Sequence, residues 1–147
     1  MKKILFLFLT VLTFISCKDP DNVEPGASQA DLISLSTWEL QRFTDATGQS
    51  IPNSELNTQA LFLYAMYFEF QGGGEVRGVD KTTKSIIDKG VWSFLNDSTS
   101  VNVKLTGLDY DFRIIELKTN KLTLQAPTGN FLSEVGDQIN LEFNAVN

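Results

Sequence analysis

The chain has 147 residues, of which 42% are hydrophobic and 20% charged, and this size fits a single domain with one core. It contains no histidine and one cysteine, which excludes Ser-His-Asp and Cys-His catalysis, the common Cys/His zinc motifs and any internal disulfide. The net charge of -6 argues against a nucleic-acid partner, because phosphate backbones are bound by arrays of Lys and Arg.

The first residues of the chain predict an export signal. Lys2 and Lys3 precede the apolar run Ile4 to Ile15, which is shorter than the roughly 20 residues of a membrane-spanning helix. The last two residues of this run and the next two, Phe14-Ile15-Ser16-Cys17, resemble the lipobox of bacterial lipoproteins. This resemblance implies a signal peptide at 1–16 and lipidation of Cys17. The alternative is a conventional signal peptide with an incidental cysteine.

The segment after the cysteine predicts a tether. Residues 17–31 carry two prolines, a glycine and several acids without apolar periodicity, which is typical of a flexible, solvated linker. Cleavage before Cys17 leaves 131 residues with 10 basic and 18 acidic groups, a net charge of -8. Lys18-Asp19-Pro20-Asp21 resembles the signal that sends Bacteroidetes lipoproteins to the cell surface. We therefore expect lipid anchoring at a bacterial outer membrane, on its periplasmic or its exposed face.

From Leu32 onward, apolar and polar residues alternate, and turn residues interrupt the pattern every eight to twelve positions. The alternation predicts eight strands, at 36–43, 61–71, 75–82, 85–95, and around 101–105, 110–114, 122–124 and 139–143. The predicted turns between later strands lie at 72–74, 96–98, 119–120 and 136–137.

Eight consecutive antiparallel strands with one apolar face each predict an all-β, up-and-down barrel. A two-sheet sandwich is the structural alternative. The alternation lapses between Gly48 and Ala60, which predicts a long first loop over one end of the barrel. Within it, Pro52-Asn53-Ser54-Glu55 could begin a short helix.

Several short motifs together resemble the lipocalin-like lipoproteins of Bacteroidetes. They are Ser36-Thr37-Trp38-Glu39-Leu40, Tyr67-Phe68-Glu69-Phe70, Gly90-Val91-Trp92-Ser93-Phe94, Tyr110-Asp111-Phe112-Arg113-Ile114 and Leu122-Thr123-Leu124. The resemblance implies a calycin-type barrel over 32–147 and implies no particular ligand.

The apolar parity of each strand predicts which side chains face the barrel interior. They are Trp38, Leu40, Met66, Phe68, Phe70, Val76, Trp92, Phe94, Val101, Val103, Leu105, Tyr110, Phe112, Ile114, Leu122, Leu124, Ile139, Leu141 and Phe143. Most are expected to fill the core. The aromatic members Phe68, Phe70, Trp92, Phe94, Tyr110 and Phe112 are candidates to line a pocket for a hydrophobic ligand.

Two charged residues share the inward parity. Arg42 follows Trp38 and Leu40 in phase, and Glu116 follows Ile114. A charge facing an apolar lumen is costly unless it is paired, so we hypothesise that one or both orient the polar head of a ligand at the barrel mouth. The alternative is that the strand ends twist or bulge and both charges face water.

No other motif predicts catalysis or a cofactor. Asp109 and Asp111 could suggest a calcium site or a glycosidase pair, but they share an outward strand face and no calcium-loop pattern surrounds them. The sequence therefore predicts a lipid-anchored, non-enzymatic barrel without metal or cofactor that binds a small hydrophobic or amphipathic molecule. The alternative is a ligand-free module that docks another envelope protein or a glycan.

Overall fold

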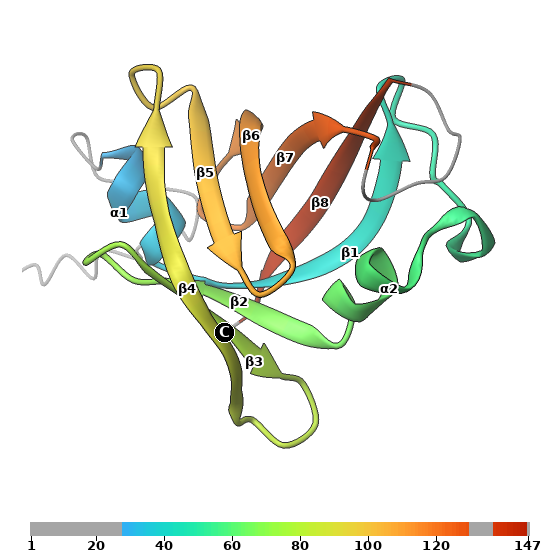
Figure 1. The fold of residues 1–147 in the computed structure, drawn as a ribbon. Coiled ribbons are helices and arrows are strands. Elements are labelled where there is room, and N and C mark those ends of the chain that lie inside the picture. The colour runs from blue at the N-terminus through green and yellow to red at the C-terminus, as the bar shows by residue number, and fades with distance from the viewer. Residues whose placement is uncertain (1–27, 130–136, 147) are drawn as a thin grey trace, which may run out of the picture.

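The computed structural model describes residues 28–129 and 137–146, so the predicted signal peptide and Cys17 lie outside the described residues. Eight strands form a closed barrel in the order β1 to β8, and every neighbouring pair is antiparallel (Figure 1). The predicted up-and-down barrel is therefore confirmed. The strands are β1 (Thr37–Asp45), β2 (Met66–Phe70), β3 (Glu75–Asp80), β4 (Ile86–Leu95), β5 (Ser100–Leu105), β6 (Leu108–Leu117), β7 (Lys121–Pro127) and β8 (Gln138–Val146).

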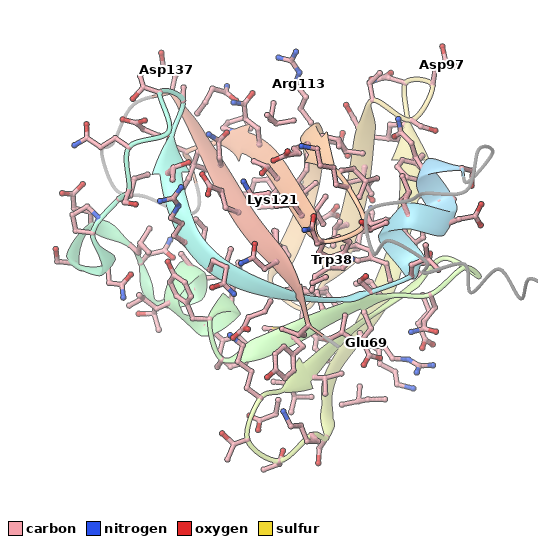
Figure 2. All side chains as sticks on the ribbon, turned by 180° about the vertical axis from the view of Figure 1, so that it is seen from behind. Trp38, Glu69, Asp97, Arg113, Lys121 and Asp137 are labelled. Atoms are coloured by element: carbon pink, nitrogen blue, oxygen red, sulfur yellow. The ribbon has the colours of Figure 1, made fainter. Side chains whose placement is uncertain are left out.

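The helix α1 (Gln29–Ser34) covers the end of the barrel where β1 begins. Ser28 caps it through a capping box with Asp31, so residues 29–31, which composition assigned to the tether, belong to the folded domain. Ile33 of α1 is fully buried, and its carbonyl oxygen accepts a hydrogen bond from Trp38 Nε1 over 2.8 Å. Figure 2 shows Trp38 among the strands, close to this helix.

The long first loop lies between β1 and β2 and carries two short helices. The 3-10 turn η1 (Asn53–Glu55) falls where a short helix was predicted. The helix α2 (Thr58–Leu63) was not predicted: Leu61 and the residues after it were assigned to a strand. Ala60 and Leu63 lie three residues apart and are both buried, which is a helical spacing. This spacing is hard to recognise in the sequence because the residues between them are also apolar.

The two helices lie at opposite ends of the barrel, because α1 precedes β1 and α2 follows it (Figure 1). We call these the α1 end and the α2 end. The glycine turn at 72–74 joins β2 to β3 at the α1 end, as predicted, and Gly74 there has a φ of 84°. Asn96–Ser98 form the predicted turn between β4 and β5, also at the α1 end.

Three β-bulges change which side chains face inward. They lie between Leu40 and Arg42 in β1, opposite Val79 in β4, and between Ile114 and Glu116 in β6. Each bulge adds a residue to one strand, so the inward and outward parity reverses after it. The positions that follow a bulge are therefore where predictions from strict alternation fail.

The core runs through the whole barrel. Of the predicted interior residues, Phe94, Tyr110 and Ile114 are partly buried and the remainder are buried. The helices and the first loop add side chains that alternation did not identify. These additional core residues include Ile33, Phe43, Ile51, Leu56, Ala60, Leu63, Leu108 and Ala126.

Candidate functional site

The barrel interior holds a small hollow bounded by apolar side chains of α2 and five strands. Its volume is about 10 Å³, about enough for one water molecule. Pockets for small molecules typically measure about 300–1,000 Å³. This hollow is therefore far smaller than a typical ligand pocket. The lining residues are Leu63, Phe68, Phe70, Val103, Leu108, Phe112, Leu124, Leu141 and Phe143.

The helix α2 closes the barrel at its own end. Leu63 is 3% exposed and contributes to the wall of the hollow, while Ala60 is fully buried. The next residue, Tyr64, packs its ring edge-on against Phe43, with centroids 5.5 Å apart. Partial burial raises the pKa of the Tyr64 hydroxyl above its ordinary value. The loop therefore covers the α2 end of the barrel, and its buried side chains extend the core.

The aromatic candidates are brought together, mostly as mutual packing partners. Phe70 meets Trp92 edge-on at 5.6 Å between centroids, and Trp92 meets Phe94 in the same way at 5.3 Å. Trp92 Nε1 donates to the Gln71 carbonyl oxygen over 2.9 Å. Edge-to-face pairs of this kind stabilise a core.

The other three aromatic candidates also lie within the barrel. Phe68 packs edge-on against Phe143 at 5.6 Å, and Tyr110 lies 5.8 Å from Phe112 in a tilted arrangement. Phe68 and Phe112 are buried, and Tyr110 is partly buried. All six aromatic candidates are therefore in or against the core, and three of them, Phe68, Phe70 and Phe112, line the small hollow.

Arg42 does not face the lumen, so the predicted inward orientation is wrong. The bulge between Leu40 and Arg42 shifts the parity, and Phe43 takes the interior position instead. The Arg42 side chain is 53% exposed, and its Nε lies 2.8 Å from Glu142 Oε2 on the neighbouring strand. Its charge is therefore paired on the outer face.

Glu116 also lies outside the lumen, for the same reason. The bulge between Ile114 and Glu116 turns it toward Lys118, whose Nζ lies 2.6 Å from Glu116 Oε1, and toward Lys121 at 3.6 Å. The hydrogen bond and charge of Lys118 hold the pKa of the Glu116 carboxyl below its ordinary value. Arg42 and Glu116 have separate partners and form no common site.

A hydrogen-bonded network on the outer face of β1, β7 and β8 was not predicted. Asn140 Nδ2 donates to the Asp45 carbonyl oxygen over 2.8 Å and lies 3.2 Å from Thr44 Oγ1, and Gln125 Nε2 donates to Asn140 Oδ1 over 3.0 Å. Thr44 also donates to Glu142 over 3.1 Å. In the sequence these residues are ordinary polar positions of alternating strands, and no signal marks them.

The carboxylates named in the sequence lie on the surface. Asp109 is paired with Lys104 at 3.1 Å, and Asn102 Nδ2 donates to Asp111 Oδ1 over 2.6 Å. Within residues 28–129 and 137–146, no three Asp, Glu, Cys or His side chains gather in a way that could hold a metal ion. The helices in these ranges are all too short or too polar to span a membrane.

A polar groove lies beside the end of β1, with a volume of about 210 Å³. The Asp45 carboxylate on its wall already accepts from Thr47 Oγ1 and from the backbone N–H groups of Thr47 and Gln49. These bonds, the Thr47 side chain first, lower the pKa of Asp45. The carboxylate thus serves to fix the turn after β1. The groove is lined by Asp45, Gln49, Ser50, Ile51, Pro52 and Glu55.

No protein-family model matches the chain, and a comparison with curated proteins found no match.

Proposed function

We propose that this protein is an outer-membrane lipoprotein, anchored through lipid on Cys17, whose lipocalin-like barrel serves as an interaction module. The anchor is supported by the signal-like segment 1–16 and by the lipobox-like residues ending at Cys17. Several acyl chains on one residue give stable membrane retention, since each buried methylene contributes about 0.8 kcal/mol. The eight-stranded barrel agrees with the resemblance to lipocalin-like lipoproteins.

The observation that supports the choice of an interaction module is the small volume of the hollow in the barrel interior. The hollow of about 10 Å³ is at least an order of magnitude below the volume of a typical ligand pocket. A barrel whose interior is occupied by its own side chains, including Leu63 from α2, offers its outer surface and loops for binding. A closed barrel also provides a rigid scaffold without free strand edges.

Native mass spectrometry of the full-length protein, purified from its own host, tests this proposal. We expect the mass of the mature acylated chain with no further small molecule bound. A stoichiometric non-covalent molecule that is released on activation would overturn the interaction-module proposal.

The anchor has an independent test. Cells that express the protein with Cys17→Ala are labelled with radioactive palmitate beside cells with the natural sequence. We expect the label only in the chain that retains Cys17, and label of equal intensity in both would contradict the anchor. Protease treatment of intact cells then distinguishes the exposed from the periplasmic face.

A second candidate function, carriage of a small apolar molecule, is favoured by the chemistry of the hollow. All nine residues around it are apolar. Leu63, which closes it, belongs to a six-residue helix, and helices of this length have little stability of their own. Displacement of α2 would remove Leu63 from the wall and enlarge the hollow. The bound molecule would then appear in the same native mass spectrum.

A further inference from the structure

The outer face of β4 carries a strip of exposed aliphatic side chains. Ile86, Ile87 and Val91 are 45%, 44% and 57% exposed. Ile86 pairs with Val79 across the bulge, where two residues of β4 stand opposite one of β3. The nearly equal exposure of Ile86 and Ile87 shows that both side chains of the bulge reach the surface. The bulge therefore places two consecutive isoleucines on the surface, in line with Val91 farther along the strand.

One lysine lies beside this strip and another lies within it. Lys84, in the β3–β4 hairpin loop, holds its Nζ 4.5 Å from the centroid of the Tyr67 ring, and its φ of 57° is unusual for a lysine. Tyr67 of β2 pairs with Val79 of β3, and Val79 pairs with Ile86, so β3 lies between the Lys84 ammonium and the isoleucines of β4. Lys89 lies between Ile87 and Val91 on β4 and is exposed.

These two lysines differ from most cations of the described chain. Arg42, Arg77, Lys81, Lys104, Lys118 and Lys121 are each within 4 Å of a carboxylate oxygen. Within residues 28–129 and 137–146, Lys84 and Lys89 form no such ion pair, although Asp80 and Glu75 are near enough to be influenced by their charges. In a chain of net charge -6, the β4 strip is thus a site of available positive charge.

We propose that the outer face of β4 docks a protein whose complementary surface carries apolar side chains bordered by carboxylates. This inference rests on the proposed interaction-module function. Protein interfaces combine apolar side chains with polar groups, and the aliphatic strip with its two lysines offers both. The strip runs along the side of a strand, whereas insertion into a lipid surface is typical of an amphipathic helix with an apolar face. Carboxylates on the partner would complement Lys84 and Lys89.

Site-specific photo-crosslinking in the host tests the surface. The photoreactive residue p-benzoylphenylalanine replaces Ile87 or, as a matched control, Ile115 of β6, whose 47% exposure is nearly the same. In the full-length anchored protein, we expect at least a tenfold higher yield of one protein adduct from position 87. Lys84→Glu with Lys89→Glu should reduce that yield at least fivefold, while Lys84→Arg with Lys89→Arg should retain it. Circular dichroism confirms that each variant is folded.

The outcomes separate this surface from the proposed function. A protein adduct from position 115 with none from 87 would overturn the β4 surface and leave the interaction-module function standing. An adduct from 87 that contains lipid or a second copy of this chain would also overturn the inference, as would a yield unaffected by charge reversal. No protein adduct from either position, together with a bound molecule in the native mass spectrum, would overturn both.

Discussion

Trp38 donates its indole hydrogen to the Ile33 carbonyl oxygen over 2.8 Å, and both residues are completely buried. The bond joins the first strand to α1, so that the helix is held against the end of the barrel. A buried carbonyl without its donor loses both the bond and its hydration.

We therefore expect Trp38→Phe to lower the free energy of unfolding by about 2 kcal/mol or more, from the lost bond and from the smaller ring. Urea denaturation followed by far-UV circular dichroism measures this loss in the free energy of unfolding. Ser36→Ala removes a bond from an only partly buried hydroxyl to the Thr119 carbonyl oxygen, at 3.2 Å, and should cost less. Equal losses in the two variants would contradict the larger contribution expected of the hydrogen bond from Trp38 to Ile33.

Gly90 is a second point where close packing determines stability. A Cβ atom there would overlap the carbonyl oxygen of Lys104 on β5, whereas a Cβ on Gly73 would meet nothing within 4 Å. Backbone cannot yield as a flexible side chain does. Gly90→Ala should destabilise the protein by about 3 kcal/mol, while Gly73→Ala should change it by less than about 1 kcal/mol. Thermal unfolding of the two variants compares them directly, and similar melting temperatures would contradict the steric argument.

The strands could be predicted because each has one apolar face, and the two-residue period survives in most of them. It fails at the bulges, and there the sequence does contain a sign. Phe43 is a large apolar residue one position out of phase with Leu40, and Ile114 is followed directly by Ile115. Both breaks fall at the observed register shifts, which also removed Arg42 and Glu116 from the interior.

The state of the lumen could not be predicted from the strands, because residues outside them decide it. Leu63 reaches the hollow from α2, a helix whose apolar residues continue directly toward β2 in the sequence. Alternation gives the direction of a side chain, whereas free volume depends on how all side chains pack together. The lipidation of Cys17 lies outside the described residues and stays a prediction.

Asn140 links three strands and should contribute more to the free energy of unfolding than the exposed ion pair between Arg42 and Glu142. Its side chain is 8% exposed and serves the Asp45 carbonyl, Thr44 and Gln125, all of which would lose a partner in Asn140→Ala. We expect a loss of about 2 kcal/mol in the free energy of unfolding by urea. Arg42→Ala, which removes a half-exposed ion pair with Glu142, should cost less than about 1 kcal/mol. A larger loss in Arg42→Ala than in Asn140→Ala would contradict the structural role of the Asn140 hydrogen bonds.

Asp80 should contribute to the pH dependence of stability. The N–H and hydroxyl of Thr83, at 2.6 and 3.0 Å, and the N–H of Thr82 lower its pKa. Because the folded pKa lies below the unfolded one, near 3.9, the stabilisation is present above about pH 4 and is lost as the pH falls through the folded pKa. Asp80→Asn should reduce the difference between urea midpoints at pH 6 and pH 2.5. An unchanged difference in Asp80→Asn would contradict this contribution.

Because α2 covers its end of the barrel, substitutions of two leucines in this helix should lower the stability by different amounts. Leu63 is 3% exposed and borders the hollow, whereas Leu61 is 38% exposed. Leu63→Ala should lower the free energy of unfolding by about 2–4 kcal/mol and Leu61→Ala by less than about 1 kcal/mol, because only the first leaves a cavity in the core. An enlarged apolar cavity stays dry and accepts small apolar molecules, so benzene should raise the melting temperature of Leu63→Ala alone. If benzene stabilises the natural chain equally, the lumen is already accessible and the interior-packed barrel is wrong.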